Sequence, residues 1–387
     1  MKTLLISENF PPKTGGSGRW FWEIYSRMPR GDYIVAAGAD ALAAAFDETH
    51  DLDCVRWPLT LPTWGVFSLS GAQGYLRLFR LLRALMKRKG IGANHCGRCL
   101  PEGLLGWMAW KWKGVPYACY VHGEEINTYS KSRELAFLSG LVFSGARMVI
   151  ANAANTKRLL NGHYEVPQDR VRVLHPGVDA SFFSSPDGGK DGRKRLNWEG
   201  KRVVLTVGRL QKRKGHDNVI RALPYIKKTM PEILYSIAGD GEERQYLDKI
   251  VAEEKLEHHV QFLGNVNDET LRDCYQNCDL FILANREVGG DIEGFGMVLV
   301  EAQACGKPVI AGDSGGTSET MLAGQTGVLI DATSPEAIAE AVTRLLDDEE
   351  KIKTMGRNAA QWARENFDWE NLALKAESIF MDIPKKG

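Results

Sequence analysis

The stretch that decides the fold runs from Glu293 to Gly316 and reads EGFGMVLVEAQACGKPVIAGDSGG. Shortly before it, the segment CDLFILANRE at 278–287 is an apolar run that predicts a buried strand. The glycine-rich loop VGGDIEG follows, and we expect a helix to open at about Phe295. The short apolar segment PVIAGD then predicts the next strand. A strand, a glycine loop, a helix and another strand in this order indicate an α/β domain with a parallel sheet.

The start of this helix has the chemistry of a phosphate-binding site. A helix N-terminus presents unpaired N–H groups and about half a positive charge. Gly294 and Gly296 allow a ligand to approach the backbone closely. The amides that we expect to hold a diphosphate are those of Phe295, Gly296, Met297 and Val298.

Two carboxylates bracket the same turn. Glu293 precedes the predicted helix, and Glu301 lies roughly a turn and a half inside it. This spacing suits one acid that accepts hydrogen bonds from a sugar and another that accepts them from a ribose, with the phosphates between them. The alternative is an acid that complements the helix dipole and a glutamate on a solvated helix face. For either residue alone, both interpretations stay open.

The arrangement Glu293-x7-Glu301, with GFG inside it and PVIAGDSGG after it, resembles the donor-site signature of the GT4 family of retaining glycosyltransferases. Within that family, DIEGFGMVLVEAQACGKPVIAGDSGGTSET most resembles phosphatidylinositol-mannoside mannosyltransferases and bacterial polysaccharide enzymes. The resemblance implies an α/β protein of the GT-B fold, with two Rossmann-like, doubly wound parallel-sheet domains that face each other across a cleft.

The resemblance also implies roles for residues elsewhere in the chain. The motif HGEE makes His122 the expected catalytic contact to the donor hexose beside Glu293, with Glu124 a weaker candidate. The loop NFPPKTGGSGR makes Gly16 a donor-phosphate contact. Arg209 and Lys214 resemble the family's diphosphate clamp, although cations after a strand are most often simply solvated. Because two cations and a helix terminus supply positive charge to the leaving diphosphate, we expect neither a metal nor another cofactor.

The predicted domains are discontinuous. We expect residues 1–180 together with about 363–387 to form an N-terminal, acceptor-binding domain, because the last helix of this fold crosses back. Residues 200–362 should form the C-terminal domain that binds the nucleotide sugar. The segment 184–200, rich in Gly, Ser and charge, is the expected boundary region.

Composition places the chain among ordinary globular proteins. It has 387 residues, 44% of them hydrophobic and 25% charged, and no apolar run reaches the roughly 18 residues of a membrane span. The N-terminus lacks the apolar length of a signal peptide, so we expect a cytoplasmic protein. Seven cysteines do not indicate a disulfide framework, and Cys96-x-x-Cys99 reads as two incidental thiols more readily than as a zinc site. Asp51-x-Asp53 precedes a strand, so we attribute this metal-like motif to chance.

Charge is unevenly distributed. Residues 1–170 carry 21 Lys+Arg against 14 Asp+Glu, and the remainder carries the opposite excess. Gly74–Gly90 predicts a basic amphipathic helix, and Trp107–Lys113 mixes tryptophan with lysine. One interpretation is a peripheral membrane surface. The other is a core helix with a solvated cationic face. We see no nucleic-acid motif.

The sequence therefore predicts retaining transfer of a hexose from a nucleotide sugar to a glycan or lipid-linked acceptor. We rank UDP-glucose first as donor and GDP-mannose second, because UDP-hexoses are the commonest donors in the family. A GT-B sugar-nucleotide epimerase and a non-catalytic carbohydrate-binding module stay open. A glycosidase is disfavoured by the diphosphate clamp. A nicotinamide dehydrogenase, suggested by Asp40, is disfavoured because Gly16-x-Gly18-x-x-Phe21 lacks the third glycine.

Overall fold

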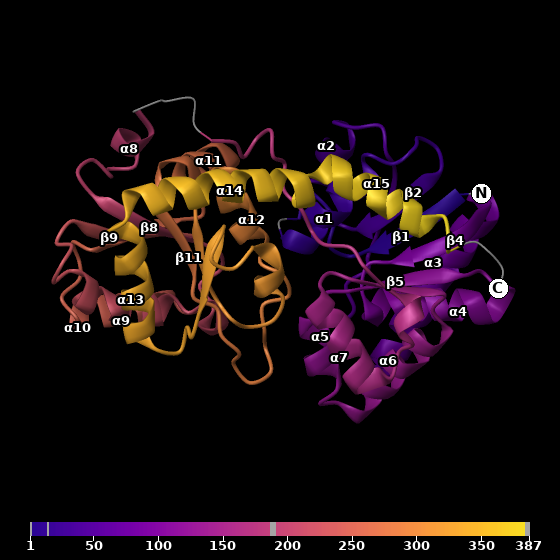
Figure 1. The fold of residues 1–387 in the computed structure, drawn as a ribbon. Helices are drawn as coiled ribbons and strands as arrows, with labels where there is room; N and C mark the ends of the chain where they lie inside the picture. Colours follow the sequence, from indigo (N-terminus) through magenta and orange to yellow (C-terminus); the bar gives the residue numbers. More distant parts are fainter. Residues whose placement is uncertain (1, 14, 186–190, 384–387) are drawn as a thin grey trace. The chain divides into compact units, whose positions relative to one another are not determined.

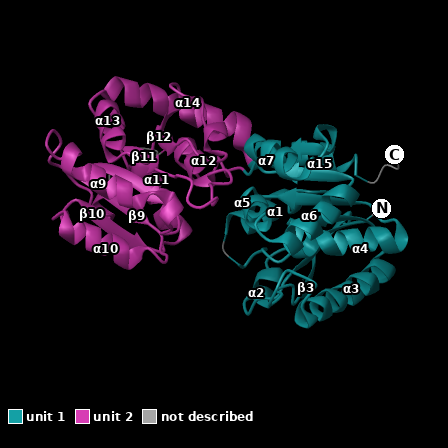
Figure 2. Ribbon diagram, turned by 90° about the horizontal axis from the view of Figure 1, so that it is seen from below, with its two compact units in different colours: residues 1–176, 369–387 teal, residues 177–368 magenta. Residues whose placement is uncertain are grey.

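The computed structural model describes residues 2–13, 15–185 and 191–383 (Figure 1). Part of the predicted boundary region, 186–190, and the end of the chain, 384–387, lie outside the described residues. The chain forms two compact units. Unit 1 comprises residues 1–176 and 369–387, and unit 2 comprises residues 177–368 (Figure 2).

Unit 1 is built on a seven-stranded parallel sheet of order β3-β2-β1-β4-β5-β6-β7. The order reverses between β1 and β4, and such a switch point leaves a crevice at the carboxyl ends of the strands. The strands are β1 Lys2–Ser7, β2 Tyr33–Gly38, β3 Asp53–Trp57, β4 Ile91–Cys96, β5 Tyr117–Val121, β6 Met148–Ala151 and β7 Val171–Val173. The helices are α1 Gly16–Tyr25, α2 Ala43–Asp47, α3 Leu69–Lys89, α4 Leu104–Lys113, α5 Glu124–Tyr129, α6 Arg133–Gly145, α7 Ala154–Tyr164 and α15 Trp369–Phe380.

Alternating side chains of the strands feed two cores, one on each face of this sheet. On one face, Leu4 and Ile6 of β1 join a buried cluster with Leu78 of α3 and Leu105 of α4. Helices α1 and α15 cover the opposite face of the sheet. There Tyr120 of β5 contacts aromatic rings of α1, and the ring of Phe380 stacks on that of Tyr25 with centroids 5.6 Å apart. The unit is therefore doubly wound, as the family resemblance implied.

Unit 2 repeats the plan with six parallel strands of order β10-β9-β8-β11-β12-β13. Its strands are β8 Arg202–Val207, β9 Ile233–Ala238, β10 Val260–Gly264, β11 Leu280–Leu283, β12 Val309–Gly312 and β13 Gly327–Ile330. Its helices are α8 Asp191–Arg195, α9 His216–Ile226, α10 Arg244–Glu253, α11 Asp268–Asn277, α12 Met297–Ala304, α13 Pro335–Leu346 and α14 Glu349–Phe367. Two parallel-sheet units confirm the predicted GT-B class.

The chain leaves and re-enters unit 1 at neighbouring points. The N–H of Val178 donates to the carbonyl of Phe367 at 2.8 Å, and the N–H of Ala180 donates to the Asp368 carboxylate at 3.3 Å. The first crossing between the units lies at residues 176–177 and the return at 368–369, whereas the sequence analysis expected 180 and about 363.

The described part of the expected boundary region packs on unit 2. Leu196 and Trp198 are buried, and the Trp198 indole N–H donates to the side-chain oxygen of Gln261 at 2.7 Å. The burial of a leucine and a tryptophan explains why this polar, glycine-rich segment is ordered against the domain. Among the described residues, no helix is both long and apolar enough to cross a membrane.

Candidate functional site

The loop after β8 is fixed by a glycine that no other residue can replace without strain. Gly215 has φ +74, and a Cβ there would lie 1.8 Å from the carbonyl oxygen of Ala284 at the end of β11. Two residues further, the N–H of Arg286 donates to the carbonyl of Arg213 at 2.8 Å. Arg286 also forms a bidentate ion pair with Asp217 at 2.8 Å for both contacts. These contacts hold the Lys212–Lys214 turn against the exit of β11.

That turn delivers two cations to Glu293. The Lys214 ammonium donates to Glu293 Oε2 at 2.5 Å, and Arg213 Nη1 donates to the same oxygen at 2.7 Å. Arg213 also pairs through Nε with Asp291 at 3.2 Å. Burial alone would raise the pKa of the Glu293 carboxyl, but the charges of Lys214 and Arg213 outweigh it and hold this pKa below its usual value. Glu293 is therefore an ionised carboxylate inside a buried cluster.

The last two residues of the segment 293–316 hold the backbone of its first residue in place. The N–H of Gly316 donates to the carbonyl of Glu293 at 3.0 Å. Gly315 has φ +70, and a Cβ there would lie 1.9 Å from the same carbonyl oxygen. The backbone that carries the carboxylate is thus positioned by the glycine pair after β12.

The predicted phosphate-binding helix is α12, and it begins at Met297. The helix therefore starts two residues later than the expected Phe295, because Gly296 adopts a left-handed conformation with φ 95 and ψ 55 and serves as its N-cap. The amides of Met297 and Val298 lie in the first turn, where N–H groups have no partner within the helix. The amide of Phe295 precedes the turn.

Glu301 lies inside α12 and is 5% exposed. Its carboxylate accepts a hydrogen bond from the Tyr275 hydroxyl at 2.7 Å. The alternative of a solvated helix glutamate is therefore wrong for this residue, since it is buried and hydrogen-bonded. Its contact with a ribose stays a prediction.

Arg209, the other predicted clamp residue, is not part of the cluster around Glu293. Its side chain is exposed and makes no hydrogen bond or ion pair with the residues that the structure describes. Of the two predicted cations, the structure brings only Lys214 onto Glu293. It adds Arg213, which the sequence reasoning did not name, although the run Lys212-Arg213-Lys214 offered it.

The remaining predicted residues belong to unit 1. The His122 ring lies between β5 and α5, and its Nε2 donates to the carbonyl of Gly97 at 2.8 Å. Because a carbonyl only accepts, a neutral ring keeps its lone pair on Nδ1, which can accept a hydrogen bond from a hydroxyl. Its backbone N–H donates to the Glu125 carboxylate at 2.8 Å. Gly16 is the first residue of α1 and is exposed, and Glu124 is exposed as well.

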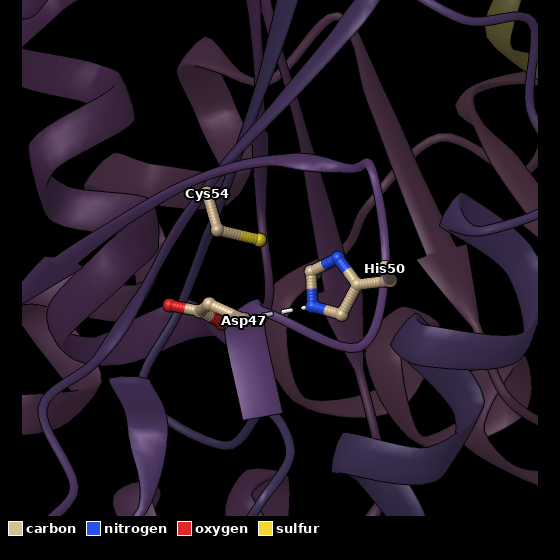
Figure 3. Close-up of side chains that lie close together, drawn as sticks. All are labelled: Asp47, His50 and Cys54. Carbon is tan, nitrogen blue, oxygen red and sulfur yellow. Dashed lines mark ion pairs between the residues drawn. The ribbon is translucent and has the colours of Figure 1, made fainter. Parts of the chain in front are cut away.

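One cluster in unit 1 has the composition of a metal site, and Figure 3 shows it. The ligand atoms of Asp47, His50 and Cys54 lie within 4.8 Å of one another. However, Arg56 binds both oxygens of Asp47, at 2.5 and 3.0 Å. His50 Nδ1 accepts the N–H of Leu52 at 3.2 Å, so in a neutral ring Nε2 carries the proton and has no lone pair to offer. Burial raises the pKa of the Cys54 thiol to about 12. These groups do not fit a metal.

The other metal-like motifs have ordinary partners. Asp51 pairs with Arg30 at 2.6 Å, and Asp53 pairs with Lys89 at 2.7 Å. Cys96 and Cys99 are buried free thiols.

We predict that Gly315→Ala destabilises unit 2 more than Gly324→Ala does. Both glycines have positive φ, but the space around Gly324 is open. Gly324→Ala is the control, and it should lower the free energy of unfolding only by its conformational strain, about 1–2 kcal/mol. Gly315→Ala should lower it by about 1–3 kcal/mol more, because the new Cβ clashes with the Glu293 carbonyl. Urea denaturation measures both costs, and equal values would mean that the Glu293 backbone is not held as described.

Comparison with known proteins places this geometry in a family. Residues 190–362 match the model described as "Glycosyl transferases group 1", and residues 14–182 match "Glycosyltransferase Family 4". The chain is 30% identical over 385 residues to a GDP-mannose-dependent alpha-(1-6)-phosphatidylinositol monomannoside mannosyltransferase of Mycolicibacterium smegmatis, with 97% of each chain covered. It is 26% identical to a GDP-mannose-dependent enzyme of Corynebacterium glutamicum that acts on the monoacylated form, with 99% of each covered.

Among solved structures, an Anabaena protein in complex with UDP superposes with a TM-score of 0.83 at 22% identity, with 98% of this chain and 100% of that chain covered. This similarity shows the GT-B fold. The match of both halves to family models and the full-length relative at 30% identity show that the chain belongs to the GT4 family of glycosyltransferases.

Proposed function

We propose that this protein transfers a hexose from a nucleotide sugar to a hydroxyl of a glycan or lipid-linked acceptor, with retention of anomeric configuration. The observation that carries the proposal is the convergence of Lys214, Arg213, Glu293 and the N-terminus of α12 in unit 2. A carboxylate beside two cations and a row of helix amides is suited to a sugar linked to a diphosphate.

The cations have a specific task in this proposal. A nucleoside diphosphate leaves as charge develops on its bridging oxygen, and fixed positive groups stabilise that charge. Without donor, the Lys214 ammonium is neutralised by Glu293. When the donor binds, we propose that Lys214 and the exposed Arg209 engage the diphosphate with the amides of Gly16 and of residues 295–298. Glu293 then accepts hydrogen bonds from the sugar hydroxyls.

Two further contacts complete the proposed donor site. His122 Nδ1 accepts a hydrogen bond from the hexose, and Glu301 accepts hydrogen bonds from the ribose. In this assignment unit 1 supplies the acceptor-binding domain and unit 2 the donor-binding domain.

The ionisation of Glu293 weighs against a glycosidase. The acid of such an enzyme needs a pKa raised so that it can donate a proton at neutral pH. The pKa of Glu293 is lowered, because the cations beside it outweigh its burial. An epimerase of the same fold would convert the sugar nucleotide without an acceptor, so analysis of the products with and without acceptor separates the two reactions.

For the donor we now favour GDP-mannose over UDP-glucose. The relatives that match the whole chain are named GDP-mannose-dependent enzymes. The Anabaena complex with UDP is only 22% identical, which supports the fold and not the base.

We predict that GDP binds more tightly than UDP, measured by isothermal titration calorimetry in EDTA, since we propose no metal. Arg209→Ala combined with Lys214→Ala should weaken binding at least about tenfold, because a hydrogen bond to a charged group contributes about 1.5–3 kcal/mol. Lys212→Ala is the control, since Lys212 lies in the same turn but is exposed. Unchanged affinity in the double variant would exclude the clamp, and no nucleotide binding at all would exclude the function.

We also propose that unit 1 contacts an anionic membrane surface through α3 and α4. The apolar stripe of α3 is buried in the core, as expected for a core helix. A membrane could therefore contact only the cationic face of this helix. That face joins α4, where the Arg83 guanidinium lies 4.5 Å from the Trp112 ring centre and Lys111 lies 4.4 Å from that of Trp110. Cations that contact tryptophan rings suit a lipid headgroup region.

We expect Arg77→Gln with Arg80→Gln to weaken co-sedimentation with anionic vesicles roughly 30-fold, because each cation near such a surface contributes about 1 kcal/mol. Both side chains are exposed. The matched control removes two exposed cations from unit 2, Lys255→Gln with Lys351→Gln. If the two double variants weaken vesicle binding equally, or if the protein does not prefer anionic over neutral lipid, α3 and α4 do not form the membrane contact.

A further inference from the structure

A cavity of about 500 Å³ opens in unit 1 at the carboxyl ends of three strands. Its walls are Glu8 and Asn9 after β1, residues 60–64 after β3, and Arg98 after β4. Since β1 and β4 flank the point where the strand order reverses, the cavity lies where a doubly wound sheet places its ligand.

The cation in this wall lacks close partners. The Arg98 side chain is 20% exposed, and its nearest carboxylate contact is Nε to Glu102 at 3.9 Å. Its guanidinium makes no hydrogen bond to the side chains or backbone of residues 2–13, 15–185 and 191–383. A largely buried guanidinium has five N–H donors to satisfy, and its planar fork matches an oxyanion.

The neighbouring acids do not neutralise Arg98 at close range. Glu8 accepts from the Thr60 hydroxyl at 2.8 Å and lies 3.6 Å from the Lys13 ammonium, so it has its own cation. Glu102 is fully buried, and burial raises the pKa of its carboxyl despite the opposing charge of Arg98. The guanidinium N–H groups of Arg98 therefore remain available as donors to a ligand in the cavity.

The other walls suit a ring that carries hydroxyl groups. The half-buried ring of Trp64 is held edge-on by Tyr129 at 5.5 Å between centroids, which gives the cavity a rigid aromatic wall. The amide of Asn9 and the hydroxyl of Thr63 can donate and accept, and the Glu8 carboxylate can accept.

The cavity wall is also linked through the backbone to the histidine assigned to the donor sugar. His122 Nε2 donates to the carbonyl of Gly97, the residue that precedes Arg98. Arg98 therefore directly follows the residue that holds the ring of the proposed hexose contact.

We propose that this cavity is the acceptor site and that the acceptor is a hydroxylated ring bearing an oxyanion, phosphate or carboxylate, which Arg98 binds in bidentate fashion. This inference rests on the proposed function, since it assigns the second substrate of the same reaction. Glu8 and Asn9 bind the ring hydroxyls, and Trp64 covers one face of the ring.

The test uses the full chain saturated with GDP and titrates it with glucose, glucose 6-phosphate and glucuronate by calorimetry. We expect one of the two anions to bind roughly tenfold or more tightly than glucose, because it adds charge-assisted hydrogen bonds to Arg98. The phosphate and the uronate arms identify which oxyanion fits. Arg98→Gln should reduce the affinity for that anion to the level of glucose, and Arg98→Lys should restore part of it. Arg158→Gln, an exposed change on α7 of the same unit, is the control.

The proposal fails if neither anion binds more tightly than glucose, or if the anion preference survives in Arg98→Gln. Thermal melting followed by circular dichroism shows whether the variants are folded. If Arg98→Gln is not folded, Arg98→Lys is used as the test variant instead. Failure here is distinguishable from failure of the proposed function, because GDP binding is measured first on the same sample. Intact GDP binding without an anion preference overturns only the acceptor site.

Discussion

The ion pair between Glu293 and the cations of the Lys212–Lys214 turn is the interaction on which the rest of unit 2 depends. A carboxylate that is 10% exposed would be costly to bury alone, and Lys214 and Arg213 offset that cost. The backbone on each side of this ion pair is fixed by a glycine that packs closely on a carbonyl group. Gly215 packs on the carbonyl of Ala284, and Gly315 packs on that of Glu293. Backbone geometry, rather than side-chain packing, therefore sets the distance between the charges.

This arrangement gives the charges two uses. Without a diphosphate, the cations keep Glu293 ionised and the carboxylate keeps the cations satisfied. With a diphosphate, the proposed donor offers Lys214 a stronger anion and offers Glu293 neutral hydroxyls. Unit 1 differs, since the Arg98 guanidinium has only a 3.9 Å contact with the Glu102 carboxylate and lines a cavity. The cations of the proposed donor half are thus hydrogen-bonded internally, whereas the Arg98 guanidinium in the proposed acceptor half keeps its N–H donors for a ligand.

Much of the fold could be predicted from the sequence, because parallel strands buried on both faces read as short apolar runs. Strand β4 gave no such signal: its segment IGANHC carries Asn94 and His95, and the His95 ring is satisfied by a hydrogen bond to Tyr25 at 2.6 Å. For the site, the motifs indicated Lys214 and Glu293 but not their contact, which depends on loop conformation. Arg213 was missed because three consecutive cations look alike in sequence, and only the turn directs two of them inward.

The most direct test of the central claim is Glu293→Gln, measured for GDP affinity by calorimetry and for hexose transfer by rate. If Glu293 competes for Lys214 and Arg213 in the free enzyme and contacts only the sugar in the complex, GDP should bind as tightly as before or more tightly. The transfer rate should fall by about 100-fold or more, as it does when one preorganised contact to the reacting group is lost. A loss of GDP affinity in proportion to the loss of rate, or an unchanged rate, would contradict the account.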